Sequence, residues 1–234
     1  MPANAVTRFP SGLTNNGPDD ILAALLDADP TKMHVYFNDF NDYTAGDWTV
    51  TETDGSATEA TTAGDGGLLL ITNTAADNDA VVMQKTPAAF AMTAGKQAWF
   101  KVKFKVSDAT QSDIQFGVVI VDTTPLDATD GIYFIKNDDA ATVDFIVRKN
   151  ATTGSTIATS VATLSNNTYV TLGWYYDGIS LVQYSVDDVI KGAVSGTSAF
   201  LPDATNLTVS MMIQNGEAVA KTMTVDYIFA AVER

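Results

Sequence analysis

The 234-residue chain has 46% hydrophobic residues and no cysteine, so it can bury a sizeable core but can form neither disulfides nor a thiolate site. Its formal net charge of −15 repels nucleic-acid phosphates and anionic membranes, and we expect neither as a partner. The N-terminus lacks a signal-peptide core, and the longest apolar runs are strand-sized, far below the roughly 20 residues of a membrane helix. We therefore expect synthesis in the cytoplasm and no membrane insertion.

Residues 1–33 form an N-terminal arm that differs from the rest of the chain. Proline, glycine and asparagine interrupt it, and one short helix is predicted to begin at Pro18 and to end before Pro30. An apolar stripe along that helix comprises Ile21, Leu22, Leu25 and Leu26. A helix this short is marginal alone in water, so its stripe must dock either on its own domain or on a neighbouring chain.

Residues 34–234 show β patterning almost throughout. Apolar residues alternate with polar ones over residues 99–106 and 222–229, which is the period of a strand. Asp177-Gly178 separates two strand-like runs and indicates a hairpin. Turn-rich segments recur at short intervals, and no alternation of strands and helices is visible. The pattern predicts one all-β domain, an antiparallel β-sandwich or barrel, with its boundary after residue 33.

One face of the 99–106 strand combines Trp99 with Lys101, Lys103 and Lys105. We expect this face to be exposed, where it could meet an acidic partner or a neighbouring subunit. A lysine-rich strand also discourages edge-to-edge aggregation, and that interpretation is equally open. The remaining aromatic residues, among them Trp48 and Trp174, are expected to pack in the core, although exposed rings could also form a sugar-binding platform.

Catalytic chemistry is sparse in this sequence. His34 is the only histidine, and no Gly-x-Ser-x-Gly elbow accompanies it. The four glutamates do not form a cluster on one strand, although glycoside hydrolysis needs a pair of carboxyl groups. We therefore predict that the protein is not an enzyme.

Calcium is the one cofactor that the residues suggest. Asn38, Asp39, Asn41 and Asp42 crowd the end of the first predicted strand, and Asp226 lies in the last one. Hard oxygen ligands of this kind suit calcium. The alternative is that these residues make only a hydrated turn.

The sequence from about residue 34 onward resembles the concanavalin A-like jelly-roll family, close to laminin-G-type modules. The segments that carry the resemblance are FNDF at residues 37–40, QAWFKVKFKV, DGIYFIKND, LSNNTYVTLGWYYDG and the closing TVDYIFAAVER. The resemblance implies a jelly-roll sandwich and a structural calcium shared by Asp39 and Asp226. The chain lacks the catalytic glutamate pattern of the hydrolytic members.

The first 48 residues resemble structural proteins of short-tailed bacteriophages that decorate the capsid exterior, through RFPSGLTNN at residues 8–16 and LLDADPTKMHVYFNDF at residues 25–40. This resemblance implies a virion protein that decorates or cements the capsid surface by binding the major capsid protein through its arm. A homo-oligomer is expected, and a trimer would suit local threefold points of a shell. The expected contact residues are Arg8, Phe9, Pro10, Leu13, Ile21, Leu22, Leu25 and Leu26. The alternative function is a carbohydrate-binding module or adsorption protein on the virion surface.

Overall fold

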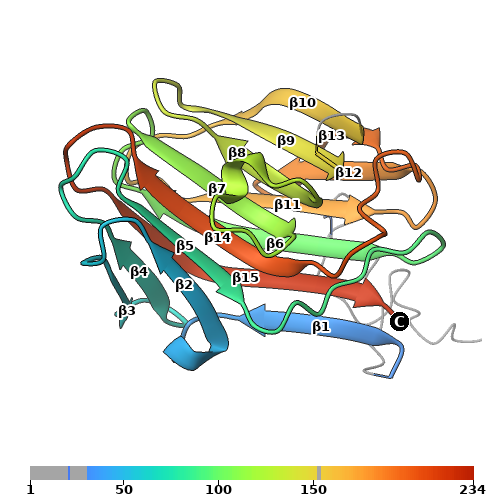
Figure 1. Cartoon of the computed structure of the whole chain (residues 1–234), viewed down its shortest axis with the longest axis horizontal. Helices are drawn as coiled ribbons and strands as arrows, with labels where there is room; N and C mark the ends of the chain where they lie inside the picture. Colours follow the sequence, from blue (N-terminus) through green and yellow to red (C-terminus); the bar gives the residue numbers. More distant parts are fainter. Residues whose placement is uncertain (1–20, 22–30, 152–153) are drawn as a thin grey trace, which may run out of the picture.

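Two antiparallel sheets face each other and contain nearly all the regular structure (Figure 1). The computed structural model describes residue 21, residues 31–151 and residues 154–234. The predicted arm helix, and all the expected arm contacts except Ile21, lie outside the described residues. Within them every strand pairing is antiparallel, which confirms the predicted all-β sandwich.

The eight-stranded sheet has the order β13-β12-β11-β6-β15-β4-β3, with β1 also paired to β15. Its strands are β1 (Met33–Asn38), β3 (Thr58–Thr62), β4 (Leu68–Thr72), β6 (Ala98–Val106), β11 (Val170–Tyr176), β12 (Leu181–Val186), β13 (Val189–Ser195) and β15 (Thr222–Glu233).

The seven-stranded sheet has the order β10-β9-β8-β7-β14-β5-β2. Its strands are β2 (Trp48–Glu52), β5 (Ala80–Lys85), β7 (Ser112–Val119), β8 (Gly131–Lys136), β9 (Thr142–Lys149), β10 (Gly154–Thr163) and β14 (Thr208–Asn215). Two short 3-10 helices, η1 (Ala45–Asp47) and η2 (Pro125–Asp127), lie in connecting segments.

The core lies between the sheets because inward residues of facing strands are apolar. Phe100, Val102 and Phe104 of β6 are buried there, as the alternation of residues 99–106 predicted, and Phe104 meets Phe116 of β7 with ring centroids 4.3 Å apart. Trp48 and Trp174 are also buried in this cluster, which confirms their predicted packing role.

The predicted hairpin at Asp177-Gly178 is confirmed. Strands β11 and β12 pair through a four-residue connection in which the Asp177 carboxylate accepts the backbone N–H groups of Ile179, Ser180 and Leu181. Gly178 has φ of +79°, a conformation that glycine adopts without a steric penalty.

The outer face of the eight-stranded sheet is less exposed than expected. Trp99 stacks on Tyr175 and is only 2% exposed, and Lys101 is 7% exposed in an ion pair with Asp188. The prediction of an exposed face was therefore wrong for Trp99 and Lys101. Ile21 is also buried, and its side chain lies close to Gly173, because glycine has no side chain that would prevent this approach to the sheet.

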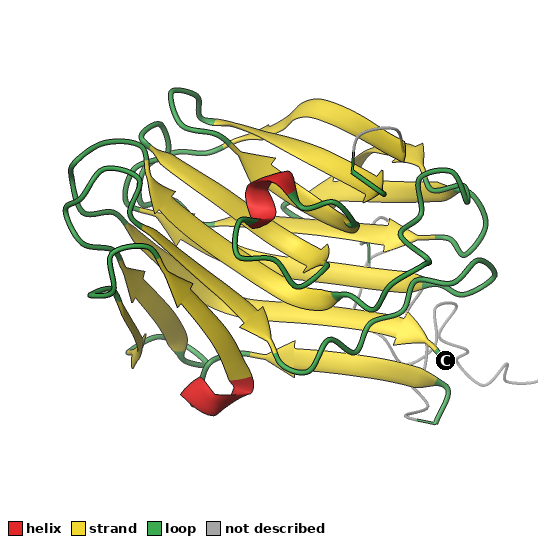
Figure 2. Cartoon of the chain, in the orientation of Figure 1, coloured by secondary structure: helices red, strands yellow, loops and turns green. Residues whose placement is uncertain are grey.

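The outer face of the seven-stranded sheet is crossed by a strap, residues 120–130, that contains η2 (Figure 2). Gln84 holds the start of the strap: its Nε2 donates to the carbonyl of Ile120, and its Oε1 accepts the N–H of Asp122. Leu126 packs on an apolar patch of β5 and β14, and the Tyr133 hydroxyl donates to the carbonyl of Ala128. The strap is thus fixed at both ends and in the middle.

Candidate functional site

A hollow of the described surface lies where β15 ends and β1 begins, a junction seen at the lower right of Figure 1. Antiparallel pairing sets Met33 opposite Glu233 and His34 opposite Val232. Because side chains alternate along a strand, His34 and Val232 point to the same side of the sheet. The register therefore brings the only histidine beside the last residues of the chain.

The opposite wall of the hollow is the segment from Thr86 to Lys96. Phe90 and Met92 are buried, whereas the residues that alternate with them, Ala89, Ala91 and Thr93, are exposed. Phe90 also exchanges backbone hydrogen bonds with Leu207, which fixes the segment to the sandwich. The outward positions carry small side chains, and this leaves room in front of His34.

Two adjoining cavities make up this groove, and both are lined by His34 and Ala89. The larger, about 320 Å³, is also lined by Ala91, Thr93, Lys96, Val232, Glu233 and Arg234. The smaller, about 200 Å³, is lined by Val35, Tyr36, Lys85, Thr86, Pro87 and Phe90. The larger cavity falls at the lower end of the volumes typical of small-molecule sites. We call the two together the His34 groove.

His34 joins the two cavities and is held by an aromatic contact. Its ring lies 4.7 Å from the ring of Phe90 between centroids, at an angle of 57°. Burial, and then the positive charge of Arg234, lower the pKa of His34 from 6.5, so its imidazole is neutral at pH 7. A neutral imidazole offers one hydrogen-bond donor and one acceptor, which suits hydroxyl groups.

The larger cavity of the groove is lined by three charged residues and the smaller cavity by one. Lys96 and Arg234 line the larger cavity with Glu233, whose carboxylate accepts the backbone N–H of Gln97. In the smaller cavity the Lys85 ammonium donates to the carbonyl of Thr86 and lies 5.7 Å from the centre of the Tyr36 ring. The groove therefore combines ring faces with polar groups at its rim.

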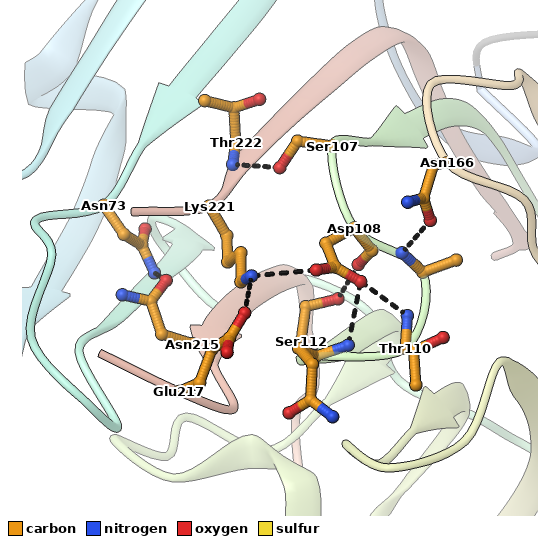
Figure 3. Close-up of polar contacts among 12 residues, drawn as sticks. Asn73, Ser107, Asp108, Thr110, Ser112, Asn166, Asn215, Glu217, Lys221 and Thr222 are labelled. Carbon is orange, nitrogen blue, oxygen red and sulfur yellow. Dashed lines mark hydrogen bonds and ion pairs between the residues drawn. The ribbon is translucent and has the colours of Figure 1, made fainter. Parts of the chain in front are cut away.

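A second polar cluster lies at the other end of β15, around the buried Lys221 (Figure 3). Its ammonium lies 2.8 Å from the Asp108 carboxylate and 2.6 Å from that of Glu217. Asp108 also accepts the backbone N–H groups of Thr110 and Gln111. Burial alone would raise the pKa of Asp108, but these hydrogen bonds and Lys221 outweigh it and lower the pKa from 3.8 to about 2.

The same end holds a buried amide pair. Asn73 donates to the carbonyl of Asp79 and to the side-chain oxygen of Asn215, and Asn215 donates to the carbonyls of Thr74 and Ala76. These groups satisfy the polar backbone of the connecting loops. We therefore assign this end of the sandwich a structural role.

The outer face of the seven-stranded sheet carries no pair of carboxylates at its centre. Asp113 and Gln115 alternate on β7, and Ser210 of β14 donates to the Gln115 side-chain oxygen at 2.9 Å. An amide cannot supply the proton that glycoside hydrolysis requires of a carboxylic acid. At this position of β7 an amide side chain is therefore present, and not a carboxyl group.

The predicted calcium ligands Asp39 and Asp226 each contact another side chain, and calcium binding by them stays a prediction. The Asp226 carboxylate is in an ion pair with Lys103 at 2.7 Å, and that of Asp39 accepts a hydrogen bond from the Asn41 amide. Among the described residues, no group of three or more acidic or histidine side chains is arranged to hold a metal ion. Calcium takes six to eight oxygen ligands, and an ammonium already neutralises one of the two carboxylates.

Sequence reasoning singled out His34 but missed the rest of its groove. Lys96 and Arg234 carry no local motif, and only the strand register and the Phe90 anchor bring them near His34. The signal that the sequence contains is the alternation of small and large residues over 89–93, which in the structure are exposed and buried in turn.

Comparison with solved structures gives several similar folds. An endo-1,3-beta-glucanase from Streptomyces sioyaensis has a TM-score of 0.63 and 12% identity, with 88% of this chain and 98% of that chain covered. The carbohydrate recognition domain of Emp47p has a TM-score of 0.57 and 13% identity, covering 87% and 98%. A protein of unknown function from Shewanella oneidensis MR-1 has a TM-score of 0.60 and 14% identity, covering 86% and 87%.

This chain has the concanavalin A-like jelly-roll fold. The fold expected from the resemblance is confirmed. No protein-family model and no curated protein matches the sequence. No helix within the described ranges is long and apolar enough to cross a membrane.

Proposed function

We propose that this protein binds carbohydrate in the His34 groove. The observation that carries the proposal is the pair of cavities, about 320 and 200 Å³, that share His34 and join ring faces to polar side chains. Sugars present apolar C–H faces and a surround of hydroxyl groups, so they need both kinds of contact. His34 and Tyr36, which are both partly exposed, supply the rings, and Thr93 and Lys96 supply hydrogen-bonding groups.

The fold supports this proposal by analogy. Its structural neighbours include a glucanase and a carbohydrate recognition domain by name, so the same scaffold serves proteins that handle glycans. A fold alone does not determine function, and the proposal therefore rests on the groove.

We infer further that binding occurs without hydrolysis. Glycosidases flank the scissile bond with two carboxyl groups, about 5 to 9.5 Å apart. Among the described residues, Glu233 is the only acidic side chain that lines the groove, and it already accepts the N–H of Gln97. A binding role needs no second carboxylate.

The test is a glycan array followed by titration calorimetry with the best ligand. His34→Ala removes the ring common to both cavities and Thr93→Val removes a rim hydroxyl, so each should weaken binding about tenfold or more. Lys191→Gln, an exposed lysine on β13, is the control and should bind as the wild type does. Circular dichroism would confirm that each variant is folded. Absence of binding to any glycan, or full binding by both groove variants, would contradict the proposal.

Decoration of a phage capsid through the N-terminal arm stays a prediction. Seven of its eight expected contact residues lie outside the described residues, and the eighth, Ile21, is buried against Gly173 of the chain's own sheet. Co-sedimentation with undecorated phage heads, by the full chain and by a variant lacking residues 1–30, would test this partner. Binding by the full chain alone would support it, and binding by neither would remove it.

A further inference from the structure

The larger cavity of the His34 groove carries two cations in a protein whose formal net charge is −15. Both lie at neighbouring strand ends: the end of β15, next to Arg234, pairs on one side with the start of β6, next to Lys96, and on the other side with β1, which carries His34. Within the described part of the chain, neither side chain forms an ion pair with a carboxylate. Two unpaired cations that face one cavity create a local positive potential.

Several other lysines of this protein are neutralised by carboxylates. Lys101 pairs with Asp188, Lys103 with Asp226 and Lys149 with Asp203, at distances between 2.5 and 2.7 Å. Lys221 has two carboxylate partners. Acidic residues outnumber basic ones by 28 to 13, yet among the described residues no carboxylate forms an ion pair with Lys96 or Arg234.

The single carboxylate in the cavity does not cancel these cations. Glu233 accepts the backbone N–H of Gln97 at 2.7 Å, and this bond orients its carboxylate toward the chain. Two cationic side chains, Lys96 and Arg234, thus line the cavity against the one acidic side chain of Glu233. An anion entering the cavity would therefore meet attraction from both Lys96 and Arg234.

We propose that the preferred ligand of the His34 groove is an acidic saccharide, one that carries a carboxylate such as a uronic acid. This inference rests on the proposed carbohydrate-binding function. A guanidinium matches a carboxylate with two parallel hydrogen bonds, and Lys96 adds a second positive charge in the same cavity. His34 and Thr93 then accept or donate hydrogen bonds to the sugar hydroxyls.

The probe is α-1,4-linked trigalacturonic acid, compared with its methyl ester, which has the same ring and no charge. Calorimetry on the full chain should show at least tenfold tighter binding of the acid than of the ester, the scale of a charge-assisted hydrogen bond. Lys96→Gln and Arg234→Gln should each remove most of that preference, whereas Lys96→Arg should keep it. Lys191→Gln removes one positive charge on β13, which is separated from β15 by three strands, and should leave the preference intact.

The outcomes separate the two proposals. Tighter binding of the acid that weakens on raising the salt concentration, and that is lost in Lys96→Gln, supports the acidic ligand. Equal binding of acid and ester, or an unchanged preference in both glutamine variants, overturns the acidic ligand and leaves carbohydrate binding in place. Failure of the acid, the ester and every neutral glycan to bind overturns both.

Discussion

The ion pair between Asp108 and Lys221 gives the sharpest test of what holds the sandwich closed at the end remote from the groove. Asp108→Asn removes the negative charge but keeps an oxygen that can accept the N–H groups of Thr110 and Gln111. The folded protein lowers the pKa of Asp108 from 3.8 to about 2, which corresponds to about 2 kcal/mol of stability at neutral pH. We expect the variant to lose up to that amount.

The pH dependence follows from the direction of the shift. A carboxyl group with a lowered pKa stabilises the fold fully above its unfolded value of 3.8, and this contribution is lost as the pH falls through about 2. The difference between wild type and Asp108→Asn should therefore be constant from pH 7 to pH 5 and about half as large at pH 3.

Thermal and urea unfolding at pH 7, 5 and 3 measure this difference. For a chain of 234 residues, 2 kcal/mol corresponds to a lowering of the melting temperature by about 4 to 8 °C. Asp42→Asn, at an exposed position, is the control and should change stability by less than about 0.5 kcal/mol. A difference between wild type and Asp108→Asn that is equally large at pH 7 and pH 3 would refute the role given to this charge.

Three further substitutions test the remaining strained or buried positions. Glu59→Gln should raise the melting temperature at pH 7 but not at pH 4. Burial, and then the negative charge of Glu52, raise the pKa of Glu59, so the fold disfavours the charged form of Glu59 as the pH rises. An equal change in melting temperature at both pH values would contradict this. Gly67→Ala should destabilise by about 2 kcal/mol or more in urea unfolding, since Gly67 has φ of +98° and an added Cβ would overlap the carbonyl of Phe40; a change below about 0.5 kcal/mol would count against that geometry. The wild type should gain up to about 3 kcal/mol of stability between pH 8 and 10.5, because burial lowers the pKa of Lys136 to about 8 and the fold favours its neutral form. Lys136→Met should remove this gain. Parallel stability–pH profiles of the two proteins would contradict this prediction.

Neutral His34 is central to the proposed site, and its neighbours explain why. Burial, and then the positive charge of Arg234, lower the pKa of His34 and so disfavour an added proton on the imidazole. Glu233, the one nearby acid among the described side chains of the groove, is engaged by the Gln97 amide. The histidine is therefore available as a donor and acceptor for hydroxyl groups, while the two cations remain available for an acidic group.

The sequence by itself determined the elements of this fold. Alternation over residues 99–106 and 222–229 predicted β6 and β15, and Asp177-Gly178 predicted the β11–β12 connection. These signals are local, because strand periodicity and turn chemistry depend on consecutive residues and on the backbone conformations that each of them allows. The absence of helical periodicity beyond the arm was enough to predict an antiparallel sandwich.

Only the tertiary structure decided which side chains share a site. His34, Lys96 and Arg234 are far apart in the sequence and meet because β1 pairs with β15 and because Phe90 anchors the facing segment. The same holds for Asp226, which forms an ion pair with Lys103 of the neighbouring strand β6. Register between distant strands is set by the packing of the whole core, and no local pattern in the sequence encodes it.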